Sequence, residues 1–214
     1  MNLYRELTRP LAPLGGGGRL LAVVPGVVTN NQDPDNLGRV KVKFPWLAEG
    51  EESAWARLVS PVAGAKRGLF WLPEVGDEVL LAFEHGDPGR PYVLGGLWNG
   101  VDTPPTDAGD GRDVRVLKSR SGHLVRLDDS DGAEKIEIVD KSGGNSIVLD
   151  TAANTITLTS GKDIQLKAPQ GKILLEAQEI QVRSSAATKV EASGSLTVQA
   201  SGSLTLKGST VMIN

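Results

Sequence analysis

The sequence predicts an all-β protein, in which a small globular barrel is followed by an intertwined trimeric β-helix shaped as a triangular prism. Three observations lead to this fold class. Short alternating segments fill the first hundred residues, two near-identical octads lie close to the end of the chain, and no aromatic residue follows Trp98. Alternation of apolar and polar residues is the period of a strand with one dry face.

Residues 1–19 are predicted to be a flexible arm, because Gly15 to Gly18 are four consecutive glycines and favour a loose tether. Residues 20–100 are predicted to be the barrel. Five alternating segments occur there, separated by Gly, Pro, Asp and Asn: LLAVVPGVVT, GRVKVKFPWL, AWARLVSPVA, DEVLLAFEH and PYVLGGLWN. Five strands in about 80 residues suit a small barrel.

Residues 101–118 are predicted to be a linker. Eleven of the twelve prolines precede residue 106, and the linker begins around Thr103-Pro104-Pro105-Thr106. The loss of aromatic and proline residues beyond this point marks a boundary between a globular domain and a fibrous one. Residues 119–214 form the fibrous part, which we call the needle.

The needle is built of short repeats. Residues 193–200 read SGSLTVQA and residues 201–208 read SGSLTLKG. Earlier blocks share an apolar pair at positions i and i+2, and turn residues such as Gly161 and Gly171 separate the blocks. We expect these pairs to form the core of the trimer: Ile147, Leu149, Ile156, Leu158, Ile164, Leu166, Ile173, Leu175, Ile180, Val182, Leu196, Val198, Leu204 and Leu206.

Trimerisation is predicted because a single chain cannot bury these pairs. A five-residue strand has two inward side chains, and one octad is too short for a full coil of a solenoid, which takes roughly 20 residues or more. Three copies of the chain, each supplying one side of a prism, solve both problems. We therefore expect an obligate homotrimer, since an isolated chain would leave its strand edges unpaired.

Composition excludes several classes of function. The net charge is −3 and the charges are spread over both halves, so no basic footprint for nucleic acid is expected. The chain has no cysteine, which excludes disulfides and cysteine-ligated metals. No apolar run approaches a membrane span or a signal peptide, so synthesis in the cytoplasm is expected.

No catalytic residue, cofactor site or metal site is predicted. The segment from Leu127 to Gly132 fails the calcium-loop pattern at its first ligand position, and neither His85 nor His123 has a nucleophile or acid placed beside it. The four tryptophans are open to two interpretations. They are core or subunit-contact residues, or else they form a stacking platform of the kind that binds oligonucleotides or sugars: Trp46, Trp55, Trp71 and Trp98.

Two stretches of the chain resemble a known family. Residues 30–47, NNQDPDNLGRVKVKFPWL, and residues 73–100, PEVGDEVLLAFEHGDPGRPYVLGGLWNG, are similar to the OB-fold domain of contractile-tail spike proteins. That family includes the baseplate assembly protein V of phages and the valine-glycine-repeat proteins of type VI secretion. Residues 122–150 resemble the start of their trimeric β-helix, so the resemblance implies an OB-fold barrel followed by a needle.

The resemblance implies a structural protein, the central spike of a phage tail baseplate or a related injection device. It implies docking on a separate hub protein at the OB-fold end, because the large N-terminal hub domain of valine-glycine-repeat proteins is replaced here by an arm. It also implies transient contact with a target membrane and delivery to the target envelope. The histidine-x-histidine motif that holds iron in some phage spikes is absent.

The C-terminal end is predicted to dock another protein. Val211, Met212, Ile213 and Asn214 follow the last octad without a polar cap. In the family, a conical protein of the proline-alanine-alanine-arginine type covers this end; self-capping is the alternative. Two rival functions remain open: a carbohydrate-binding or carbohydrate-active tailspike, and an OB-fold ligand-binding module with a trimerisation tail.

Overall fold

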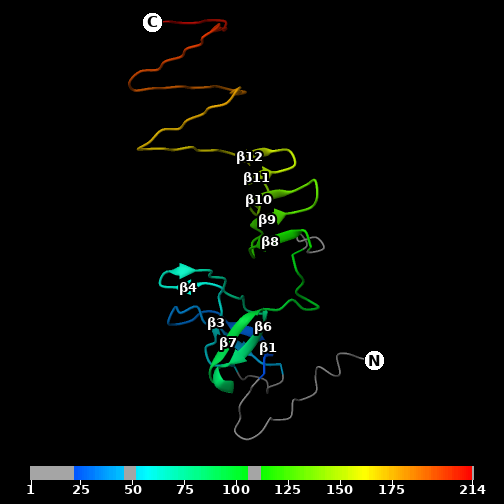
Figure 1. Cartoon of the computed structure of the whole chain (residues 1–214). Helices are drawn as coiled ribbons and strands as arrows, with labels where there is room; N and C mark the ends of the chain where they lie inside the picture. Colours follow the sequence, from blue (N-terminus) through cyan, green and yellow to red (C-terminus); the bar gives the residue numbers. More distant parts are fainter. Residues whose placement is uncertain (1–21, 46–51, 106–111, 214) are drawn as a thin grey trace. The chain divides into compact units, whose positions relative to one another are not determined.

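The computed structural model of the chain describes residues 22–45, 52–105 and 112–213 (Figure 1). The chain divides into two units, residues 1–161 and 162–214, which are described separately. The predicted arm, residues 1–19, lies outside the described residues, as do Trp46 and Asn214. Within the described residues the regular structure is β-strand with one short 3-10 turn, η1 (Glu84–Gly86), so the all-β prediction is confirmed.

The barrel is one curled five-stranded sheet. Its order is β2-β1-β6-β7-β3, antiparallel except for the parallel pair β3 and β7. A bridge between Val40 and Ala56 joins the β2 side of the sheet back to β3. Each strand lies in one of the five predicted segments, except that β1 ends one residue beyond its segment, and the OB-fold is confirmed: β1 (Val24–Asn30), β2 (Lys41–Lys43), β3 (Arg57–Leu58), β6 (Glu78–Phe83) and β7 (Pro91–Gly96).

The barrel core consists of aliphatic side chains with two phenylalanines. Along β6, alternate residues are buried, as the period of a strand requires. Gly26 lets the sheet close tightly, because a Cβ there would lie 2.8 Å from Leu81 Cδ1. No described tryptophan belongs to this core, which contains Val24, Val28, Val40, Val42, Phe44, Ala56, Val79, Leu81, Phe83 and Val93.

A small hairpin that the sequence did not predict follows β3. It consists of β4 (Ala63–Gly64) and β5 (Arg67–Gly68). The hydroxyl oxygen of Ser60 lies within hydrogen-bond distance of the carbonyl oxygens at both ends of the hairpin, 2.9 Å from that of Val62 and 2.8 Å from that of Leu69. Gly68 has φ +144°, and a Cβ there would lie 2.3 Å from the Val62 carbonyl oxygen, so this position requires glycine.

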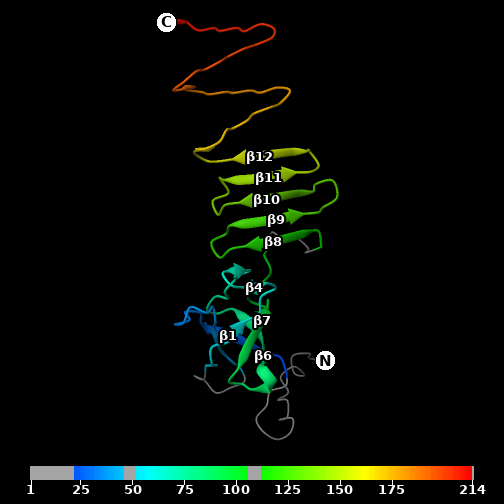
Figure 2. The ribbon, with the colours of Figure 1, turned by 60° about the vertical axis from the view of Figure 1, so that its left-hand side comes forward.

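A second sheet, which we call the meander, contains five successive antiparallel strands: β8 (Val114–Lys118), β9 (Leu124–Asp128), β10 (Lys135–Val139), β11 (Ser146–Asp150) and β12 (Thr155–Thr159). The strands lie in sequence order, one beside the next (Figure 2). The strand β8 lies within residues 101–118, the predicted linker. The pairing of all five strands occurs inside one chain.

Residues 162–213 have a different character. No strand is assigned in this stretch, and every one of its residues is exposed. The backbone runs back and forth in extended segments that leave their hydrogen-bonding groups without a ladder in the single chain (Figure 2). The trimeric β-helix stays a prediction, since the strands that it requires are not formed by one chain alone.

Candidate functional site

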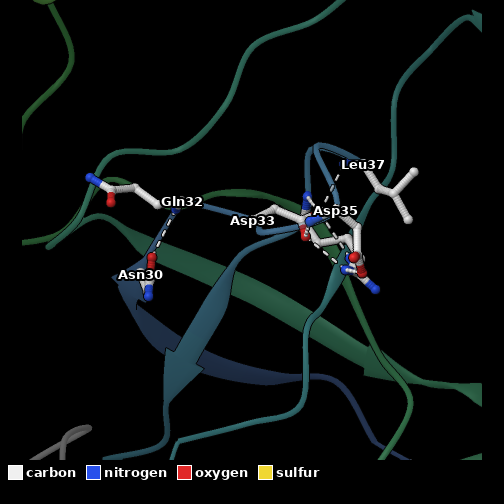
Figure 3. A network of polar contacts seen from close by, with 6 residues as sticks. Asn30, Gln32, Asp33, Asp35 and Leu37 are labelled. Atoms are coloured by element: carbon white, nitrogen blue, oxygen red, sulfur yellow. Dashed lines mark hydrogen bonds and ion pairs between the residues drawn. The ribbon is translucent and has the colours of Figure 1, made fainter.

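The β1–β2 loop is held by a buried carboxylate. Asp33 accepts hydrogen bonds from the backbone N–H groups of Asp35, Leu37 and Arg39 at 3.0–3.2 Å. The Arg39 guanidinium adds two more, Nε at 2.9 Å and Nη2 at 2.7 Å (Figure 3). A single side chain therefore fixes the loop, which carries the DPDN motif of the sequence.

The electrostatics of this clamp keep it ionised. The Arg39 guanidinium, together with the backbone N–H donors, holds the pKa of Asp33 well below its usual range. The same ion pair raises the pKa of Arg39. Two neighbouring residues have positive φ, Asn36 at 53° and Gly38 at 70°, which the clamp stabilises. This network is structural, and it presents no open coordination position.

The turn between β6 and β7 is fixed in a similar way. His85 has φ +51° inside η1, and the Asp87 carboxylate accepts from the N–H of Gly89 at 2.9 Å. Glu84 and Arg90 are joined by a backbone hydrogen bond of 3.0 Å and an ion pair of 3.4 Å. The HGDPG segment is thus a tight turn.

In the described part of the chain, no group of three His, Asp or Glu side chains could hold a metal ion.

The meander presents an apolar face that nothing in the single chain covers. Ile136 pairs with Leu127 on one side and Leu149 on the other, while Ile138 pairs with Val125 and Ile147. In the next ladder Ile156 pairs with Leu149 and Leu158 pairs with Ile147. Most of these side chains are exposed, and Ile156 reaches 74%. Side chains that share a face of five strands form one continuous surface.

The opposite face of the meander carries charged pairs, and it also carries apolar residues such as Leu124, Val139 and Val148. Arg126 and Glu137 pair across β9 and β10, and Lys135 lies 3.6 Å from the Glu137 carboxylate. Asp128, on the same face, has a pKa lowered mainly by the hydroxyl of Ser130 and the backbone N–H of that residue. The two faces therefore differ in that the charged pairs lie on this face, opposite Ile136 and Ile138.

The predicted trimer-core residues fall into two groups. Ile147, Leu149, Ile156 and Leu158 lie together on the apolar face, whereas the ten from Ile164 to Leu206 lie in residues 162–213 and are exposed. Sequence analysis missed five residues that share this face, although the alternation in LVRLD and KIEIV signals the last four: Leu117, Val125, Leu127, Ile136 and Ile138.

The remaining predicted residues are placed as follows. Val211, Met212 and Ile213 are exposed, so they are available for docking, which stays a prediction. Trp71 and Trp98 are exposed and Trp55 is half-buried, so the core interpretation of these three is wrong. The interpretation as subunit contacts stays a prediction.

No helix among the described residues is long and apolar enough to cross a membrane.

Comparison with known proteins agrees with this geometry. Residues 24–98, the barrel, match the family described as the type VI secretion system/phage-baseplate injector OB domain. The type VI secretion system spike protein VgrG3 of Vibrio cholerae is 30% identical over 145 residues, which are 66% of this chain and 14% of that protein. The chain belongs to the contractile-tail spike family.

Two further spike proteins, both of Pseudomonas aeruginosa, are similar to the chain. VgrG1a is 30% identical over 165 residues, 72% of this chain, and VgrG1b is 32% identical over 147 residues, 63% of this chain. This member of the spike family spans 26% and 20% of the length of those two relatives. Because the alignments exceed the length of the barrel, the similarity reaches beyond the OB domain.

Proposed function

We propose that the chain is the central spike of a contractile injection machine, either a phage tail baseplate or a device of the type VI kind. The observation that carries the proposal is the uncovered apolar face of the meander. Nine side chains on five strands alternate inward on this face, and the same apolar pairs continue along the chain to Leu206. Exposed apolar surface of this kind marks an interaction site, and we infer that other copies of the chain cover it.

Three copies of the chain supply a cover for the apolar face of the meander and hydrogen-bond partners for the rest of the needle. Three meanders placed with their apolar faces inward enclose a dry prism and leave the charged pairs of the opposite faces in water. Beyond Gly161, strands of one chain gain ladder partners from the other two. Bending such a prism requires breaking ladder bonds in several chains at once, so the needle is stiff enough to transmit a thrust.

The partners follow from the proposed spike. The OB-fold end docks on a hub protein, and the exposed Val211, Met212 and Ile213 take a conical tip protein of the proline-alanine-alanine-arginine type. The spike is made in the cytoplasm, joins a baseplate or injection particle, and contacts the target membrane transiently. The relatives are named as spike proteins, and we propose that this chain too acts mechanically, without catalysis, cofactor or nucleic acid.

The test is the native mass of two single variants on one strand. Ile156 lies on the apolar face of β12, and its neighbour Thr157 lies on the opposite face; both are exposed in the single chain. Ile156→Asp places three carboxylates in the shared core and should abolish the trimer. Thr157→Asp should leave the trimer intact. A wild-type protein that light scattering shows to be a folded monomer contradicts the proposal.

A further inference from the structure

A concavity on the barrel gathers positive charge and apolar surface. It has a volume of about 1070 Å³ and is lined by residues of the β1–β2 loop, β3, the β4–β5 hairpin and the β6–β7 turn. In OB-folds, the face of strands two and three, flanked by the first and the last of the barrel loops, is where ligands bind. The concavity occupies this part of the barrel, and the hydrogen-bond networks around Asp33 and Asp87 leave its interior open.

Three cations in the concavity have no carboxylate partner among the residues that the structure describes. Arg39 and Arg90 also line it, but these two are paired with Asp33 and Glu84. The unpaired cations are Arg57, Lys66 and Arg67. Arg67 is held against the hairpin, since a Cβ on Gly64 would lie 2.9 Å from its guanidinium carbon.

Open apolar side chains lie beside these cations. Phe70 and Trp71 are 73% and 56% exposed, and Phe70 packs on the β1–β2 loop, where a Cβ on Gly38 would lie 2.8 Å from its ring. Leu37 and Leu69 add exposed aliphatic surface to the same concavity. The hairpin backbone is fixed by Ser60 and Gly68, so this surface is preorganised rather than loose.

We propose that the concavity binds an acidic, apolar-bearing segment of another polypeptide. Guanidinium groups match carboxylates in a two-bond geometry, and the aliphatic and aromatic lining suits leucine-like side chains between the acids. Recognition of nucleic acid fits less well, because the rings of Trp55 and Tyr92 are already covered by cations, so that of the aromatic residues in the lining only Phe70 and Trp71 stay open. Stacking of successive bases needs open rings along a cationic track.

The inference rests on the proposed function in one respect: the partner is a protein of the machine in which the spike is seated. It deepens that function by naming the surface and the chemistry of the contact. The hairpin is the element to mutate, because Lys66 and Arg67 are exposed and lie outside the barrel core. Reversing these two charges should therefore leave the barrel folded.

Binding is measured by the fluorescence anisotropy of short labelled probes with the full chain. The probes are a peptide of glutamate and leucine, the same peptide with glutamine for glutamate, and a single-stranded oligothymidylate of equal charge. The test variant is Lys66→Glu with Arg67→Glu. The control, Lys43→Glu with Lys141→Glu, changes the net charge equally at exposed positions outside the concavity.

The proposal expects saturable binding of the glutamate peptide, weakened about tenfold or more in the test variant and unchanged in the control. Trp71→Ala should weaken it as well, because the variant removes apolar contact without changing charge. Equal binding of the glutamine peptide, tighter binding of the oligothymidylate, or unchanged binding by the test variant overturns the proposal.

The native mass of the same samples separates this inference from the proposed function. If the protein is a trimer that does not bind the glutamate peptide, the docking inference is wrong and the proposed spike function stands. If the protein is a monomer that binds the peptide, the spike function is wrong and the docking inference stands. If the test variant loses its trimeric mass, the concavity is covered by another copy of the chain, and the docking inference is wrong.

Discussion

The barrel and the meander are both five-stranded sheets with alternating apolar residues, but only the barrel buries its own. In the barrel, Val40 and Ala56 close the curled sheet, and side chains such as Val79 and Leu81 are fully buried. In the meander, Ile138 is 48% exposed although its strand pairs on both sides. Neighbouring strands are paired by hydrogen bonds in both sheets, so the burial of the side chains is what separates them.

The difference shows that one pattern can specify two levels of structure. Alternation determines that a strand has a dry face, while closure of the sheet determines whether the same chain supplies the cover. The barrel achieves closure with a strongly curled sheet and clamped loops at Asp33 and Asp87. The meander, with open edges at β8 and β12, leaves its cover to other chains.

Disrupting the needle beyond the meander should have the largest effect. Ile164→Asp puts three charges into the predicted shared core and should prevent assembly of the trimer, as should Leu196→Asp. Gln165→Asp, on the adjacent outward position, is the matched control and should assemble normally. Analytical ultracentrifugation measures both, and a trimeric Ile164→Asp variant would show that this stretch has no buried core.

A core truncation in the barrel should have a smaller and purely local effect. Leu81→Ala removes a fully buried side chain and should lower the free energy of unfolding of the barrel by about 2–5 kcal/mol. Urea denaturation followed by tryptophan fluorescence measures this loss. The exposed Leu94, changed to Ala, is the control with little effect. The native mass should be unchanged in both variants, since the barrel core is complete in one chain.

The Asp33 clamp should make the barrel sensitive to acid. Because the folded pKa of Asp33 lies below its unfolded value, its contribution is complete above the unfolded value of about 4 and declines as the pH falls below it. Asp33→Asn should lower the thermal midpoint near neutral pH and flatten its fall toward pH 3. The exposed Asp35→Asn variant should keep the wild-type slope, and an equally steep slope in Asp33→Asn would contradict the assignment.

Removal of the chain end should have the smallest effect on stability. Deletion of Val211 to Asn214 should leave the thermal midpoint and the trimeric mass unchanged, because every residue of the predicted trimer core, up to Leu206, stays in place. The deletion should nevertheless abolish capture of a conical tip protein in a pull-down. Deletion of residues 1–4 at the other end is the length-matched control. Unchanged capture by the truncated trimer favours self-capping.

The sequence by itself determined the all-β class and the five strands of the barrel. Alternation and turn residues act within a few positions, so the segments around Val28, Leu81 and Ile147 could be recognised without knowledge of their partners. The motifs NNQDPDN and HGDPG also indicated the OB-fold correctly, since each forms a loop that is held by hydrogen bonds between residues close in the sequence. The apolar alternation at Ile136 and Ile138 was equally visible, although sequence analysis did not include it in the core.

Tertiary structure alone decided what lies beside what. Five meander strands pair within one chain, which alternation cannot distinguish from pairing between chains because both satisfy the same strand period. Trp55, Trp71 and Trp98 lie outside the core, which is made of aliphatic residues and two phenylalanines. The concavity brings Arg57, Lys66 and Arg67 together with Tyr92 because β3 pairs with β7. In that pairing Arg57 lies opposite Tyr92, which follows it by 35 positions in the sequence. Net charge, a sum over the whole chain, carries no information on such a local gathering.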